Sequence, residues 1–412
     1  MELKTKYQYT YFIHPYVIDE RKYDKYILKL VKNKRCKLKI FEREKDINIY
    51  KYFLPKAREL LFWSFGLDRN KIKKLQEMDY DTKAIILSKY NCVTFEYILE
   101  KNIQGKLGEN NGIFFDLNKV EIICFSTGVC FIILKAIIEN SNDFQDILDF
   151  NYKFKDINSE IYKMNKYENI RIQSDKFNNS EDITKFIKDI TGKSTGSKEF
   201  NIDNQSFLVY AYTCIDGEYW KSEHDFEKYS NEFYKYTNIK PSTYNIDFSK
   251  EYERNNGIIS SWNYTKFGIS KMGSVLITSG IQADNYTKLP YEYENEYLYT
   301  YILILYKKLM LKKINALFSK VQNFRNVKNQ FIQFTQKVWI QDVTDDELGN
   351  KLMDMWSRTL RIDDIYAKAK NKYDIMYKDY NIEKTRKTNK WIMVLLILSL
   401  ILNIINFSKL LG

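Results

Sequence analysis

Few residues of this 412-residue chain have the types and spacing that catalysis or metal binding requires. Its two histidines, His14 and His224, lie far apart in the sequence and have no recognisable partner. Its five cysteines match no zinc or redox motif and are Cys36, Cys92, Cys124, Cys130 and Cys214. We expect Cys124 and Cys130, which lie in an apolar run, to be small core residues, and the two histidines to be core or surface residues. We expect neither enzymatic activity nor a bound cofactor.

Carboxylates are the richer group, and they gather in the C-terminal third. Asp342, Asp345, Asp346 and Glu347 form one cluster, and a second, shorter pair follows at residues 363–364. Such oxygens suit a hard cation such as Mg²⁺. They equally suit the N-terminal turn of a helix, where negative charge complements the helix dipole. Both readings stay open from the sequence.

Positive charge exceeds negative charge, with 65 Lys and Arg against 53 Asp and Glu and a formal net charge of +12. The densest basic patch comprises Lys29, Lys32, Lys34, Arg35, Lys37 and Lys39. A basic balance can favour nucleic acid or an anionic membrane surface. Because the lysines are dispersed among acidic residues, we expect the patch to be solvated surface, with ligand or phosphate binding as the alternative, and we do not expect nucleic-acid binding.

The most apolar segment of the chain, from Trp391 to Phe407, is nearly free of charge. As a helix it covers roughly 25 Å, close to the thickness of a bilayer core, and Leu410 and Leu411 can extend it. A basic cluster precedes it, comprising Lys384, Arg386, Lys387 and Lys390. By the positive-inside rule this predicts a single-pass helix in the bacterial inner membrane, with the N-terminal body in the cytoplasm. A buried or interfacial helix is the alternative.

Three polar residues interrupt the apolar segment. Ser399, Asn403 and Asn406 are spaced four and three apart and therefore share one helix face. Amides that face lipid are costly, so this face predicts self-association with a second copy. The alternative is that both asparagines lie at headgroup level.

The elements that must position this helix fall into two parts. Residues 1–281 mix strand-like and helical patterns and predict an α+β cytosolic domain. Its clearest feature is an antiparallel meander in which a strand from Gly112 turns at Asn118-Lys119, and the next turns at Thr127-Gly128. The continuous apolarity of these strands predicts a sheet that is covered on both faces.

Residues 282–390 predict a helical stalk with a turn near residues 340–346. Thr344 and Glu347 form a T-x-x-E capping box. Beyond it a seam with four–three spacing comprises Leu348, Leu352, Met355, Ile362, Tyr366, Ala369, Tyr373, Met376 and Tyr380. This spacing predicts a coiled coil or a helix hairpin. An unbroken helix from Thr344 to Phe407 would be roughly 95 Å long.

The order of an α+β body, a helical stalk and a C-terminal membrane helix (residues 391–411) resembles the CorA magnesium-transporter superfamily. The similarity lies in "LMDMWSRTLRIDDIYAKAKNKYDIMYKDYNIEKTRKTNKWIMVLLILSLILNI" and, loosely, in "GIFFDLNKVEIICFSTGVCFIILKAI". It implies a homo-oligomer, commonly pentameric. The family's Gly-Met-Asn motif and second membrane helix do not appear in this sequence, so magnesium as an ion or cofactor is implied by the resemblance alone.

The leading functional hypothesis is a tail-anchored, homo-oligomeric CorA-like protein whose cytosolic domain senses a ligand and acts at or through the membrane helix, as a channel or another membrane effector. The alternatives are a non-conducting, membrane-tethered binding module and a relative of divalent-cation transporters. The ligand itself has no signature in the sequence.

Overall fold

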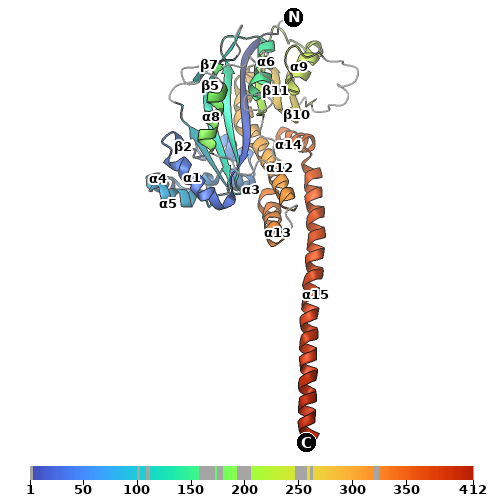
Figure 1. Ribbon diagram of the computed structural model, residues 1–412. Coiled ribbons are helices and arrows are strands. Elements are labelled where there is room, and N and C mark those ends of the chain that lie inside the picture. Colours follow the sequence, from blue (N-terminus) through green and yellow to red (C-terminus); the bar gives the residue numbers. More distant parts are fainter. Residues whose placement is uncertain are drawn as a thin grey trace.

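The computed structural model describes residues 3–99, 103–107, 112–156, 172–173, 180–192, 206–245, 258–259, 263–318 and 324–411. Its centre is an 11-stranded sheet with the order β2-β3-β5-β6-β1-β8-β11-β10-β9, while β4 pairs with β5 and β7 (Figure 1). All pairs are antiparallel except β8 and β11. The strands are β1 (Thr5–Val17), β2 (Cys36–Leu38), β3 (Cys92–Tyr97), β4 (Ile103–Leu107), β5 (Ile113–Phe125), β6 (Val129–Ile138), β7 (Ile172–Gln173), β8 (Leu208–Ile215), β9 (Ile258–Ile259), β10 (Thr265–Ser270) and β11 (Gly273–Ser279).

Helices cover both faces of this sheet, as the apolar strands predicted. They are α1 (Tyr23–Lys32), α2 (Ile47–Tyr52), α3 (Pro55–Leu61), α4 (Arg69–Glu77), α5 (Tyr80–Leu87), α6 (Phe144–Lys155), α8 (Ser180–Thr191), α9 (Ser230–Thr237), α11 (Lys288–Glu292), α12 (Leu298–Phe318), α13 (Phe324–Gln333), α14 (Glu347–Thr359) and α15 (Ile362–Leu411). Short 3-10 turns are η1 (Glu20–Lys22), η2 (Trp63–Gly66), η3 (Glu223–Tyr229) and η5 (Ala283–Asn285), and π-helical turns are η6 (Tyr293–Tyr297) and η7 (Phe334–Val338).

Two hydrophobic cores lie on opposite faces of the sheet. One packs the sheet against α1, α6, α8 and α9, and the other packs it against α2, α3, α12 and α14. The central strand β1 serves both, because its side chains alternate: Phe12 and Tyr16 enter the first core, and Tyr11 and Ile13 enter the second. The α+β body predicted from the sequence is therefore confirmed.

The predicted meander is partly wrong. The turn at Thr127-Gly128 is present, and Gly128 has the positive φ of 81° that such a turn favours. At Asn118-Lys119, however, the chain makes a β-bulge and continues, so that Ile113–Phe125 is one strand instead of two. The bulge absorbs one extra residue without reversing the strand, and the two residues offer no glycine for a tight hairpin.

The helix from Thr344 to Phe407 is interrupted. Helix α14 ends at Thr359 and α15 begins at Ile362, and between them Arg361 has a left-handed backbone with φ of 57°. Such a residue ends a helix even where it is not glycine. The sequence carries neither glycine nor proline at this joint, so it gave no stop signal.

Helix α12 packs as part of the body, because most of its residues are buried and the buried apolar ones belong to the second core. The domain boundary at residue 281 stays a prediction. Beyond α14, Figure 1 shows α15 leaving the body as a single long helix, with the C-terminus farthest from it.

Candidate functional site

Helix α14 connects the body to α15 and is docked on the start of β11. Trp356 is fully buried, and its Nε1 donates a hydrogen bond to Ser274 Oγ at 3.1 Å. Its ring also lies 5.2 Å from that of Tyr301 in α12. A buried indole with a satisfied N–H gives both apolar contact and a fixed orientation. These contacts with the body therefore fix the direction of the α14 axis.

The predicted seam is used within the chain. Leu348, Leu352, Ile362 and Ala369 are buried in the second core, and Met355, Tyr366, Tyr373 and Met376 pack partly buried against it. Stacked rings join the first turns of α15 to the preceding segment, with centroid distances of 4.3 Å for Trp339 and Tyr366 and 4.8 Å for Phe331 and Tyr373. This agrees with the helix-hairpin alternative, whereas a coiled coil between copies stays a prediction. Tyr380, at the end of the seam, is 41% exposed.

The N-terminus of α14 differs from the predicted capping box. Asp346 is the N-cap, and its Oδ2 accepts the backbone N–H of Gly349 at 2.6 Å. The Thr344 hydroxyl instead accepts the N–H of Asp346 at 3.1 Å. Two of the clustered carboxylates, Asp346 and Glu347, thus lie at a helix N-terminus, where their charge complements the dipole.

Residues 377–406 of α15 are exposed, and we call residues 377–411 of this helix the membrane arm. It contains, within the described part of the chain, the one helical stretch that is long and apolar enough to cross a membrane, with a mean hydropathy of 1.9 over 18 residues and none of that window buried. Trp391, at the start of the apolar stretch, is 70% exposed. This exposure excludes the alternative of a helix buried in the protein's own core.

The predicted site residues of the arm lie where the sequence placed them. Lys384, Arg386, Lys387 and Lys390 are exposed on the helix just before Trp391. Ser399, Asn403 and Asn406 are exposed on one face of the continuous helix. Their roles in orientation and association remain predictions.

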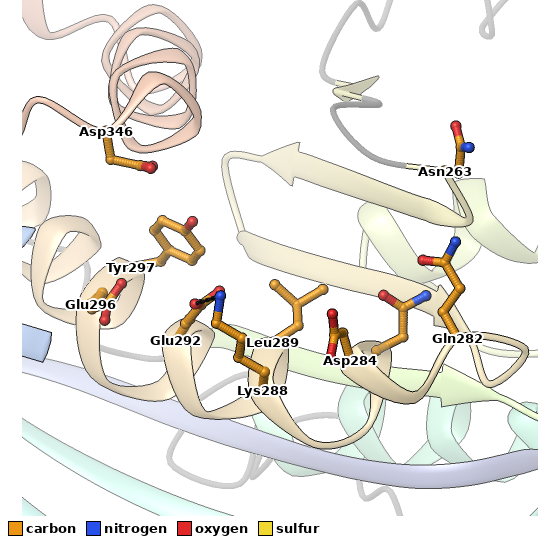
Figure 2. Close-up of a pocket in the computed structure, with 10 residues that line it drawn as sticks. Asn263, Gln282, Asp284, Lys288, Leu289, Glu292, Glu296, Tyr297 and Asp346 are labelled. Atoms are coloured by element: carbon orange, nitrogen blue, oxygen red, sulfur yellow. Dashed lines mark ion pairs between the residues drawn. The ribbon is translucent and has the colours of Figure 1, made fainter.

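A cavity of 650 Å³ opens beside the N-terminus of α14, and we call it the acidic pocket. It is lined by Asn263, Gln282, Asp284, Asn285, Lys288, Leu289, Glu292, Glu296, Tyr297 and Asp346. These residues come from the segment before β10, from η5, from α11 and η6, and from the N-cap of α14. Figure 2 shows the acidic groups strung along the cavity, from Asp346 and Glu296 at one end through Glu292 to Asp284.

Glu296 is the most unusual residue of the acidic pocket. It is only 8% exposed, and its carboxyl group makes no hydrogen bond or ion pair with another described residue. Burial, followed by the neighbouring charges of Glu292 and Asp346, raises the pKa of Glu296 from 4.5 to about 7. The Lys288 ammonium, which acts in the opposite direction on this pKa, is paired with Glu292 at 3.1 Å.

A contact path joins the acidic pocket to α14. The ring of Tyr297 lies edge-on to that of Tyr52, with centroids 5.7 Å apart. Gly349 in the first turn of α14 sits so close to Tyr52 that a Cβ there would lie 2.3 Å from the phenolic oxygen. A ligand that contacts Asp346 would touch the N-cap of α14, and one that contacts Tyr297 would touch the neighbour of Tyr52, against which Gly349 packs.

A second charged cluster, between β5 and η6, is internally satisfied. The buried carboxylate of Glu121 accepts from Lys39 Nζ at 2.5 Å and lies 3.5 Å from Lys119 Nζ. Burial alone would raise its pKa, but the two ammonium groups outweigh burial and hold the pKa at about 2. Lys135 and Glu294 extend the network at 2.6 Å. We assign this cluster a structural role.

The other sequence candidates are distributed through the fold. His14 is buried beside Phe207, and burial lowers its pKa to about 4, so it is neutral at pH 7. All five cysteines are buried free thiols, which confirms the core positions predicted for Cys124 and Cys130. The basic patch is partly neutralised, since Lys32 pairs with Asp81 and Lys39 with the buried Glu121.

The sequence did not reveal the acidic pocket. Its carboxylates come from positions as distant as Asp284 and Asp346, and only the fold brings them together. Asp346 was singled out from the sequence, but for its cluster with Asp342, Asp345 and Glu347. The local sequence "YENEY" does not indicate that the carboxyl group of Glu296 lacks a hydrogen-bond or ion-pair partner among the described residues.

Comparison with protein-family models, with curated proteins and with solved structures found no match to this chain.

Proposed function

We propose that the protein is a membrane-anchored homo-oligomer whose α+β body binds a ligand and passes the binding event through α14 to α15. The observation that carries this proposal is the exposed apolar arm, whose 18-residue window has no buried share. A helix of that composition is not stable in water unless a membrane or another protein covers it. The acidic pocket, which borders the N-cap of α14, supports the sensing part.

The proposed orientation places the body in the cytoplasm and the arm in the bacterial inner membrane. The exposed basic residues at 384–390 stand directly before the apolar stretch, which is the arrangement that retains a segment on the cytoplasmic side. Trp391 suits the interface between headgroups and acyl chains. Resistance to alkaline carbonate extraction of membranes would separate a spanning helix from one that lies in the interface.

Self-association would use the polar face of the arm. The seam from Leu348 to Met376 already packs on the chain's own helices, so it leaves the exposed part of α15 as the surface for a second copy. Ser399, Asn403 and Asn406 give that surface hydrogen-bonding groups. A CorA-like pentamer, with the arms around one axis, is the assembly that the resemblance implies.

The test of self-association is the mass of the detergent-solubilised full chain at micromolar concentration. The variant S399L/N403L/N406L should shift the mass toward the monomer. The matched control is I397L/I401L/I404L, which has the same spacing on the opposite face and should leave the mass unchanged. A strictly monomeric wild-type protein would overturn the oligomeric part of the proposal.

A plain membrane tether is the second candidate. The exposed residues between Tyr377 and Lys390 separate the body from the apolar stretch, and a separation of this kind suits an anchor that only locates the body. Replacing residues 391–411 with an unrelated single span distinguishes the two. If the oligomer and any ion conductance of reconstituted vesicles survive the exchange, the tether is correct.

A further inference from the structure

The acidic pocket carries an excess of negative charge in a protein that is basic overall. Four carboxylates line it, from Asp284, Glu292, Glu296 and Asp346, against the single ammonium of Lys288. The chain as a whole has a formal net charge of +12. A concave site of opposite sign to its surroundings attracts a cation.

Glu296 lacks the partner that a buried carboxylate requires. The residue is only 8% exposed at the wall of the pocket, and its carboxyl group makes no hydrogen bond or ion pair with the other described residues. An ionised carboxylate in such a place is unfavourable unless a proton or a cation neutralises it. The pocket is therefore a site at which an external positive charge would be stabilised.

The arrangement of the carboxylates opposes a bare metal ion. Within the described residues, no group of three or more His, Cys, Asp or Glu side chains converges closely enough to hold a metal. Figure 2 shows Glu296, Glu292 and Asp284 spaced along one helical segment, with Asp346 on a separate element at the Glu296 end, so that a ligand must be elongated to reach from Asp346 or Glu296 to Asp284. Between them, Leu289 offers apolar surface and Tyr297 offers an aromatic ring, which methylene groups and ammonium groups can contact.

We propose that the acidic pocket binds a linear polyamine, a small organic cation whose ammonium groups are separated by methylene chains. One ammonium group would pair with Glu296 and Asp346 at the root of α14, and another with Asp284 at the far end. This assignment rests on the proposed function, because it names the ligand that the body senses. Contact with Asp346, the N-cap of α14, is the point at which binding reaches the helix that leads to the membrane.

Binding of a polyamine should release protons from the protein. Near pH 7 Glu296 is partly protonated, and the groups that face it are Glu292, Asp346, Lys288, Tyr52 and Tyr297. A bound ammonium group favours the ionised form, so binding releases a fraction of a proton at pH 7 and tightens as the pH rises from 6 to 8. The ammonium groups of a simple diamine keep their charge over this range, as lysine does.

The test is isothermal titration of the full chain in detergent with 1,5-diaminopentane, with pentylamine as the matched monoamine and with Mg²⁺ alone. The diamine should bind about tenfold more tightly than the monoamine and should bind about tenfold more weakly to E296Q. Titrations in two buffers of different ionisation enthalpy should show proton release for the wild type and none for E296Q. E59Q, which changes an exposed glutamate of α3 outside the pocket, should behave as the wild type.

Equal affinity for diamine and monoamine, or a diamine affinity that E296Q leaves unchanged, would overturn the proposal. Tighter binding of Mg²⁺ than of the diamine would also overturn it, in favour of a metal site. D284N provides an independent variant at the other end of the pocket and should weaken the diamine but not the monoamine. Membrane extraction and the detergent mass do not depend on the ligand, so they show separately whether the proposed membrane function fails.

Discussion

Glu296 should weaken the folded protein at neutral and alkaline pH, and E296Q should remove that effect. The folded-state pKa of about 7 lies above the ordinary value of 4.5. Between these values the folded protein holds a proton that the unfolded chain releases. The free energy of unfolding must therefore fall as the pH rises through this window, and level off above about pH 7.

The magnitude follows from the size of the shift. A displacement from 4.5 to about 7 corresponds to about 3 kcal/mol. Because the pocket opens to water, which screens the charge, we take about 2 kcal/mol as the expected effect. E296Q keeps the shape of the side chain and cannot ionise. It should therefore gain about 2 kcal/mol over the wild type between pH 5 and pH 8.

The assay is urea unfolding of the full chain in detergent, followed by tryptophan fluorescence at pH 5 and pH 8. E59Q serves as the control, and its difference from the wild type should be the same at both pH values. The reasoning would be refuted by an E296Q variant whose advantage does not grow between pH 5 and pH 8. A confirmed gain would mean that the native carboxylate is retained at the expense of stability, as is common at binding sites.

Three further substitutions test the packing that surrounds the pocket and the arm, each by urea unfolding. G349A should lower the free energy of unfolding by about 1–3 kcal/mol, because its Cβ would lie 2.3 Å from the Tyr52 hydroxyl. The control G66A should be near neutral, because a Cβ at Gly66 would have no atom within 4 Å. Equal effects of the two variants would contradict the tight contact at Gly349. R361G should stabilise the protein by about 1 kcal/mol because glycine adopts a φ of 57° without strain, and a loss would show that the arginine side chain matters more than the backbone. E121Q should cost about 3 kcal/mol because it leaves two ammonium groups without their buried carboxylate, and a neutral result would show that the network adds nothing to stability.

The sequence predicted elements whose signals are local. The turn at Gly128 and the apolar arm each follow from turn chemistry or from composition within a short segment. The bulge at Asn118-Lys119 and the joint at Arg361 were missed because both depend on the partner strand or helix that the chain meets. Neither position carries the glycine or proline that usually marks such a change.

The candidate site was predictable only in part. Ser399, Asn403 and Asn406 share a face because helix geometry alone places them there. The sequence could not show whether the seam packs within the chain or against a second copy, because an intramolecular hairpin and a coiled coil require the same four–three spacing. The acidic pocket depends on the register of β11 and on the docking of α14, and both are tertiary features.

The exposed stretch of α15 between Tyr377 and Lys390 also sets an electrostatic distance. It spans roughly 20 Å at 1.5 Å per residue, whereas charges in physiological salt are screened over about 8 Å. In the proposed orientation, with α15 along the membrane normal, the stretch would hold the basic body well beyond the range of anionic headgroups. The body would then neither adhere to the bilayer nor feel its surface potential. The cation affinity of the acidic pocket would consequently be set by its own carboxylates and would not change with the lipid composition beneath it.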